Sequence, residues 1–277
     1  MKHSDGAWML EPVTAVPAGV LAGLGRAALV LVGETGAVGL LLLRSVRALR
    51  AIPRSVPLIV EQMRRTGIES LPLVIITSIF TGGVTAVQAA YQLKEFIPQL
   101  YLGTAIYKSV VIELGPVLTA LVVGGRVGAS IAAELGTMRV TEQIDAMEAI
   151  AIDPVRYLAM PRLVAAVVML PVLTVFADAL AIWGGMLVAN VSLGVSLKTF
   201  VEGMRMFFAA QDVYGGLIKS MVFGGIIALM GTAAGLRARG GAVGVGMAAT
   251  RAVVTSCVLI LIGDYVLATV LFRIIFR

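Results

Sequence analysis

The chain has 277 residues, of which 59% are hydrophobic and 14% are charged, and its mean hydropathy is +0.98. Soluble domains carry about 25% charged residues, so this composition excludes an ordinary soluble protein and indicates one integral membrane domain. The formal net charge is +6, but the basic residues are scattered at the ends of apolar runs and form no basic face. This distribution therefore indicates membrane topology and does not suggest nucleic-acid binding.

The N-terminal part of the chain is expected to lie on the membrane surface. Residues 1–32 are predicted to form an extension, either disordered in part or membrane-associated, ahead of a domain over 33–277. Within residues 33–50, Arg44, Arg47 and Arg50 recur every three residues beside a short apolar core. This pattern favours an amphipathic helix in the interface. A sixth span over residues 20–43 stays open, although Arg26 and Glu34 interrupt that run.

Five apolar runs that follow are long enough to cross a bilayer, whose core of about 30 Å takes about 20 helical residues. They cover residues 71–90, 106–133, 163–189, 213–236 and 253–272. All but the first contain ionisable residues, among them Glu113, Arg126, Asp178, Lys219 and Asp264. The sequence therefore predicts an all-α integral membrane protein with five transmembrane helices.

Basic residues are more frequent on one side of these predicted spans. They gather at residues 44–65, 139–162 and 237–251, whereas the other side carries fewer of them. Because cytoplasmic loops are enriched in lysine and arginine, the first set is assigned to the cytoplasm. The N-terminus is then cytoplasmic and the C-terminus lies outside.

An acidic segment, ELGTMRVTEQIDAMEAIAIDP at residues 134–154, separates spans two and three. Asp153-Pro154 is a helix stop, since the residue before proline is driven out of the α region. Upstream of that stop, Val140, Ile144, Met147 and Ala151 share one helical face. Arg139, Glu142, Asp145 and Glu148 occupy another. The pattern predicts a short cytoplasmic helix, either solvated or docked against a cytoplasmic protein.

Polar residues inside the predicted spans are expected to face one another, because charges are costly in lipid. Arg126, Ser130 and Glu134 share one face of span two, which favours a structural ion network over transport of a charged group. Asp178 and Asp264 are expected to bond between helices. The pairs Gly124/Gly128 and Gly231/Gly235 indicate close helix packing.

Several sequence blocks together carry a family resemblance. They are ELGP at 113–116, GRVGASIAAELGTMRVTEQIDAMEAIAIDPVRYLAMPR at 125–162, IWGG at 182–185, LIKSMVFG at 217–224 and ATRAVV at 249–254. The chain resembles MlaE-type permeases over roughly residues 33–272. These are membrane subunits of bacterial ABC transporters that work with MCE-domain lipid-binding proteins.

The resemblance implies that the short acidic helix is a coupling helix over residues 139–150. It would bind a groove of a separate ATPase subunit through Arg139, Glu142, Ile144, Asp145, Met147 and Glu148. It also implies a homodimer in the bacterial inner membrane, with two ATPase subunits below it and MCE-domain proteins outside.

The resemblance further implies a lipid-binding cavity at the dimer interface. The positions that match it are Gln88, Leu93, Phe96, Glu113, Leu114 and Lys219. The sequence departs from the family pattern at Ile112, where an arginine is expected, and at Phe96, where a tyrosine is expected. These departures weaken the case for a basic contact with a headgroup phosphate there, which Lys219 is the candidate to replace.

The function expected from these features is transport of phospholipid or a similar hydrophobic molecule by an ABC permease. The chain has no Walker A motif, and residues 240–246 lack the Gly-Lys-Ser/Thr ending of a phosphate loop. A partner is therefore expected to hydrolyse ATP. The alternative is an ion-coupled secondary transporter that uses Glu113, Asp178 and Asp264 as proton sites, although it leaves the acidic helix without a role.

An intramembrane enzyme is the third class considered. His3 is the single histidine, and neither HExxH nor GxSxG occurs. The sequence therefore predicts no catalytic residue, metal site or cofactor.

Overall fold

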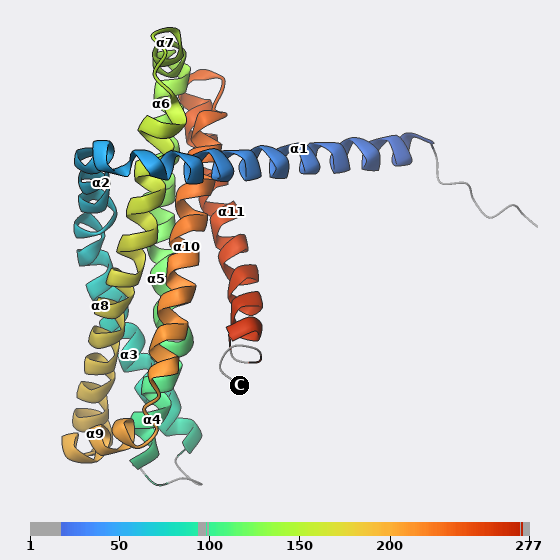
Figure 1. Cartoon of the computed structure of the whole chain (residues 1–277). Coiled ribbons are helices and arrows are strands. Elements are labelled where there is room, and N and C mark those ends of the chain that lie inside the picture. Colours follow the sequence, from blue (N-terminus) through green and yellow to red (C-terminus); the bar gives the residue numbers. More distant parts are fainter. Residues whose placement is uncertain (1–17, 94–97, 99, 272, 274–277) are drawn as a thin grey trace, which may run out of the picture. The chain divides into compact units, whose positions relative to one another are not determined.

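The computed structural model describes residues 18–93, 98, 100–271 and 273, and every regular element among them is helical. The chain divides into two compact units, Met1–Leu40 and Leu41–Arg277. In the second unit, α7 lies at one end of a helical bundle and α9 lies at the other (Figure 1). Phe96 of the predicted lipid site lies outside the described residues, and of Leu93 only the helical backbone is described.

The first part of the chain is a series of helices that ends in span one. The elements are α1 (Ala18–Ala48), η1 (Leu49–Ala51), α2 (Ile52–Thr66), η2 (Ile68–Ser70) and α3 (Leu71–Leu93). Helix α2 is amphipathic, with Ser55 and Ile59 buried and its charged residues outward. The helix expected at residues 33–50 thus begins earlier, at Ala18, and its interfacial position stays a prediction.

Span two is one long helical run with two wide turns. It comprises α4 (Leu100–Ser109), the π-helical turn η3 (Val110–Leu114), α5 (Gly115–Val123), the π-helical turn η4 (Gly124–Gly128) and α6 (Ala129–Val140). Pro116 lies just after η3 and has no backbone N–H, so it cannot bond the carbonyl four residues earlier. The ladder widens there, and the Gly115 N–H reaches the Val110 carbonyl instead.

The remaining elements complete the bundle. They are α7 (Gln143–Ala149), η5 (Val155–Ala159), α8 (Met160–Leu193), α9 (Leu197–Met206), α10 (Ala210–Leu236) and α11 (Gly241–Val270). Helix α9 was not expected from the sequence. The Ser196 hydroxyl caps it by accepting a hydrogen bond from the Thr199 N–H at 3.1 Å, and Phe200 is buried beneath it.

The predicted fold class is confirmed. Five helical runs among the described residues are long and apolar enough to cross a membrane: 35–92, 100–140, 155–193, 210–236 and 241–270. The first four contain the expected spans, and the fifth overlaps the span expected at 253–272, which extends two residues beyond it. The last begins earlier than expected, because the turn after α10 covers only Arg237–Gly240 and the glycines from Gly241 onward belong to α11.

Close helix approach holds the bundle together. A Cβ atom at Gly82 of α3 would lie 1.8 Å from the Ala181 carbonyl oxygen of α8, so the two backbones touch at that point. Gly231 of α10 likewise lies against the backbone of Gly128 in η4, as the glycine pairs predicted. The packing centre is an apolar cluster that includes Val123, Leu135 and Phe223.

Candidate functional site

A buried lysine joins three helices in the middle of the bundle. The Lys219 Nζ of α10 lies 2.8 Å from the Glu113 Oε2 of η3 and 2.9 Å from the Asp264 Oδ1 of α11. The Lys219 side chain has no exposed surface, whereas that of Glu113 is 44% exposed. A buried ammonium group is stable only when it is paired, and here two carboxylates surround it.

The backbone of span two supplies a further partner for the same lysine. Pro116 leaves the carbonyl oxygen of Ile112 without its usual helical donor. The Lys219 ammonium donates a hydrogen bond to that oxygen at 3.3 Å. The ELGP motif thus creates both the carboxylate and the free carbonyl that hold Lys219, which explains why the charge is tolerated at this depth.

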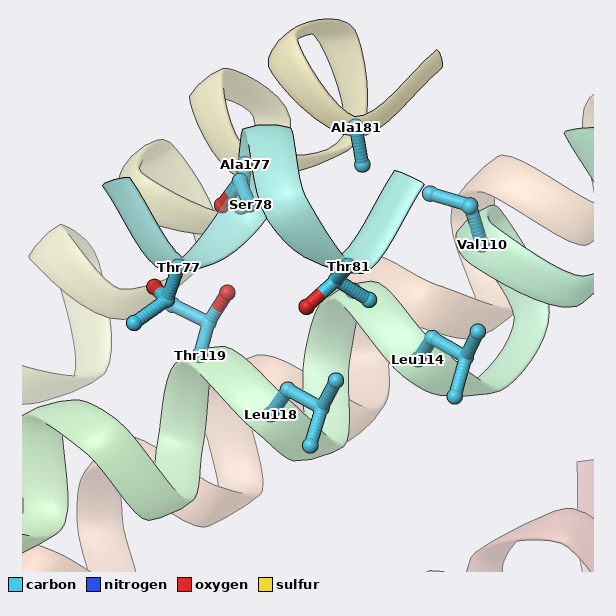
Figure 2. Close-up of a pocket in the computed structure, with 10 residues that line it drawn as sticks. Thr77, Ser78, Thr81, Val110, Leu114, Leu118, Thr119, Ala177 and Ala181 are labelled. Carbon is cyan, nitrogen blue, oxygen red and sulfur yellow. The ribbon is translucent and has the colours of Figure 1, made fainter. Parts of the chain in front are cut away.

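Leu114, at the end of η3, lines a small cavity between α3, η3, α5 and α8 (Figure 2). Thr77, Ser78, Thr81 and Thr119 give part of the lining a polar character. About 20 Å³ is open there to the centre of a water-sized sphere, which is room for one water molecule. This cavity is therefore too small for a lipid chain.

Asp178 of α8 lies close to the start of α5. Its carboxylate packs against Gly115, where a Cβ atom would collide with Oδ1. Oδ1 is buried and has no hydrogen-bond partner among the described residues. Asp264 does join two helices, but as an ion pair with Lys219, since its Oδ1 likewise has no hydrogen-bond partner among the described residues. The expected hydrogen bonds between helices are therefore not found for either of these two oxygens.

The predicted lipid-site residues are brought together only in part. Glu113 and Lys219 are in direct contact, and Leu114 follows Glu113 in the chain. Gln88 is exposed on α3, and its side chain has no described contact with the charge cluster. Sequence reasoning missed Asp264 as the third member of that cluster, because helical periodicity does not say which residues of different helices meet.

An ion network braces the end of the bundle that carries α7. Arg126 lies 2.8 Å from Glu69, and it donates a hydrogen bond to the Ser70 hydroxyl. Glu134 lies 3.3 Å from Arg65 and 3.0 Å from the buried Arg162. The network expected from Arg126 and Glu134 is thus present and ties α2 and α8 to span two. Ser130 lines the same concave surface.

The predicted coupling helix is shorter than expected. Arg139 belongs to the end of α6, and the chain turns at Glu142, whose φ of 59° is left-handed. Helix α7 then runs over seven residues, from Gln143 to Ala149. The expected helix over residues 139–150 is therefore two pieces, because one residue outside the right-handed α region is enough to end a helix.

The side chains of α7 divide as the sequence pattern predicted, except that Ala151, expected on the apolar face, lies beyond the helix and is exposed. Ile144 is buried, and Met147 packs against the apolar cluster of the bundle. Glu142, Asp145 and Glu148 are exposed. Arg139 donates a hydrogen bond to Asp145 across the corner between α6 and α7. The helix is thus held against the bundle by its apolar face and presents carboxylates to the surface.

These features define a multi-pass α-helical membrane protein with a charge cluster buried among its spans. A family model described as permease MlaE matches residues 59–270. The chain therefore belongs to the MlaE family of ABC transporter permeases.

Named relatives agree with this family. The chain is 40% identical over 240 residues to a probable ABC transporter permease protein of Rickettsia typhi, covering 86% of this chain and 93% of that one. It is 32% identical over 253 residues to the intermembrane phospholipid transport system permease protein MlaE of Haemophilus influenzae, covering 91% and 97%. It is 35% identical over 213 residues to the chloroplastic protein TRIGALACTOSYLDIACYLGLYCEROL 1 of Arabidopsis thaliana, covering 77% and 61%.

Proposed function

We propose that this chain is the permease subunit of an ABC transporter that moves phospholipid or a similar hydrophobic molecule across a bacterial cell envelope. It acts as a homodimer in the inner membrane, with its N-terminus in the cytoplasm and its C-terminus outside. A separate ATPase subunit hydrolyses ATP, and an MCE-domain protein exchanges lipid on the outer side. The phospholipid transport named for the Haemophilus influenzae relative supports this assignment.

The observation that carries the proposal is the position of α7. Its buried Ile144 anchors it to the bundle, while the carboxylates of Glu142, Asp145 and Glu148 remain exposed for a partner. Complementary charges at such a surface set register and partner choice. Helix α7 is joined to the end of α6 by a short corner that the Arg139–Asp145 hydrogen bond braces. A force applied to α7 is therefore passed to α6, which continues through η4 and α5 to η3 and Glu113.

The lipid contact is assigned mainly to Glu113. Its side chain is partly exposed in one chain, so a second copy can complete a cavity over it. Lys219 is not available to bind a headgroup phosphate in place of the arginine expected at Ile112. Its side chain is fully buried, and its ammonium is held by two carboxylates and a carbonyl oxygen. Lys219 instead fixes the position of Glu113, and the cavity selects cargo mainly by shape.

The ion-coupled transporter remains the second candidate, and one observation favours it. Asp178 has a buried carboxylate oxygen with no partner among the described residues, as a proton-carrying group in a membrane would. That scheme gives α7 no task, so the permease assignment explains more of the molecule.

Charge reversal on α7 tests the permease assignment. In a Glu142→Lys, Glu148→Lys variant the Arg139–Asp145 hydrogen bond stays intact, so the corner keeps its shape while its surface charge changes sign. We expect the affinity of the purified variant for the ATPase subunit, measured in a pull-down, to fall at least about tenfold. Two close charge pairs contribute roughly 1–2 kcal/mol or more to the free energy of binding. The control is Glu202→Lys, which changes an exposed residue of α9 at the other end of the bundle.

Two results would count against the assignment. Full ATPase association by the doubly substituted chain would remove the role given to α7. Transport that continues when ATP is absent, and stops when a proton gradient is collapsed, would favour the ion-coupled scheme.

A further inference from the structure

Five arginines converge on one concave surface near the α7 end of the second unit. Arg44, Arg47, Arg50 and Arg54 come from the end of α1, from η1 and from the start of α2. Arg156 comes from η5, which follows α7 and lies about a hundred residues after the other four arginines in the sequence. Asp153 is the single carboxylate on this surface. We call this surface the arginine basin.

The basin carries the positive charges of five arginines against the single negative charge of Asp153. All five arginine side chains are exposed, and none makes an ion pair within the described part of the chain. The Asp153 Oδ1 is already engaged, because it accepts a hydrogen bond from the Val155 N–H at 2.9 Å. Arg65, Arg126 and Arg162, by contrast, are each paired with a glutamate. The electrostatic potential in the basin is therefore strongly positive.

The shape of the basin suits a phosphate-bearing group. The volume open to the centre of a water-sized sphere is about 680 Å³, which is within the usual range of volumes for small-ligand sites. Guanidinium groups bind phosphate oxygens through paired N–H donors, so several arginines around one concavity can contact the oxygens of one phosphate together. Arginines that only set topology need no such convergence of two distant segments.

The surroundings of the basin point to a lipid as the source of that phosphate. Leu43 and Val46 are exposed on α1 next to Arg44 and Arg47, and Tyr157 is exposed next to Arg156. Apolar and aromatic side chains beside arginines are typical of the boundary between acyl chains and headgroups. Basic pockets on the cytoplasmic side of membrane proteins attract acidic headgroups in the same way.

We propose that the arginine basin binds the phosphate headgroup of an acidic phospholipid of the cytoplasmic leaflet. This lipid is a resident ligand and not the cargo, so the inference goes beyond the proposed transport function. The headgroup bridges η1 to the segment between α7 and α8. It thereby ties the base of α2 to the segment that follows the proposed ATPase-docking helix.

The test measures lipid retention by the full chain, delipidated in detergent and reconstituted into phosphatidylcholine nanodiscs with or without phosphatidylglycerol. Native mass spectrometry counts bound lipids, and hydrogen exchange follows residues 150–157. Phosphatidylglycerol should bind and slow exchange in that segment, and phosphatidylcholine alone should not. In an Arg50→Gln, Arg156→Gln variant we expect phosphatidylglycerol affinity to fall at least about tenfold, and exchange in the segment should return to its rate in phosphatidylcholine.

The matched control is Arg239→Gln, Arg251→Gln, which removes two exposed arginines outside the basin that have no carboxylate partner in the described part of the chain. It should retain phosphatidylglycerol within about twofold of the unchanged protein, since only distant, screened charge is removed. An equal loss of affinity in the control would show a general charge effect and overturn the basin. Equal protection by soluble glycerol phosphate without lipid would overturn the lipid assignment and leave a soluble anion as the ligand.

Discussion

Lys219 owes its place in the bundle to a proline on a different helix. Pro116 has no N–H to donate to the Ile112 carbonyl oxygen. The Lys219 ammonium donates a hydrogen bond to that oxygen and also forms ion pairs with Glu113 and Asp264. A single residue without an N–H thus converts a regular span into one that can hold a charge. The wide turn η3 and the charge cluster have one common cause.

Replacing Lys219 with methionine tests this arrangement. The change keeps most of the side-chain volume but leaves two neighbouring carboxylates and a carbonyl oxygen without the cation. We expect the protein in detergent to lose roughly 3 kcal/mol of stability, since removing one partner of a buried pair is strongly destabilising. Thermal unfolding followed by size-exclusion recovery measures the effect.

The companion variant adds Glu113→Gln and Asp264→Asn to Lys219→Met. Because it removes both charges that Lys219 had neutralised, it should recover part of the missing stability. An unfolding midpoint of Lys219→Met equal to that of the unchanged protein would mean that the ion cluster contributes nothing to the fold.

At the scale of elements, left-handed residues bound α7 on both sides. Glu142 precedes the helix with a φ of 59°, and Ala151 follows it with a φ of 60°. Left-handed backbone costs a residue with a Cβ atom about 1–2 kcal/mol, whereas glycine adopts it freely. The short helix is therefore set off sharply from α6 and from η5, with neither glycine nor asparagine at its corners.

An Ala151→Gly substitution should therefore stabilise the corner after α7. We expect a gain of up to about 1 kcal/mol, partly offset by the greater freedom of glycine in the unfolded chain. Hydrogen exchange of residues 143–152 should slow accordingly. Ala149→Gly, just earlier in the chain and still helical, is the control and should speed exchange, because glycine costs about 1 kcal/mol in a helix. Faster exchange in Ala151→Gly would contradict the left-handed assignment.

The sequence predicted these elements unevenly, for physical reasons. The spans are recognisable because lipid demands long apolar runs. The helix stop expected at Asp153-Pro154 is wrong in position, because α7 already ends at Ala149, before the left-handed Ala151, and Asp153-Pro154 stands directly before η5. The break at Glu142 was missed, since a left-handed glutamate has no composition signal. Helix α9 was missed because its ten residues are too short and too polar for a span search, although Ser196 and Phe200 carry a cap-and-core pattern.

At the scale of the whole molecule, the two ends of the bundle differ in what they carry. One end holds α7, the Glu134 ion network and the arginine basin, and the other holds α9 and the start of α4. The contact between Glu113 and Lys219 lies between these ends and joins helices far apart in sequence. A single sequence shows that each of these residues is charged within a span, but their pairing follows only from how the helices pack.

The difference between the two ends predicts how the chain is oriented. Because arginines are enriched on the cytoplasmic side, the α7 end should face the cytoplasm and α9 should face outward. Single cysteines test this after Cys257→Ala removes the native thiol, with Arg239→Cys at the α10–α11 turn and Glu202→Cys on α9 as exposed sites. A membrane-impermeant maleimide should label only Glu202→Cys in intact cells and both variants after permeabilisation. Labelling of Arg239→Cys alone in intact cells would invert the proposed topology, and α7 would then lie on the side where no ATP is available to a docked ATPase.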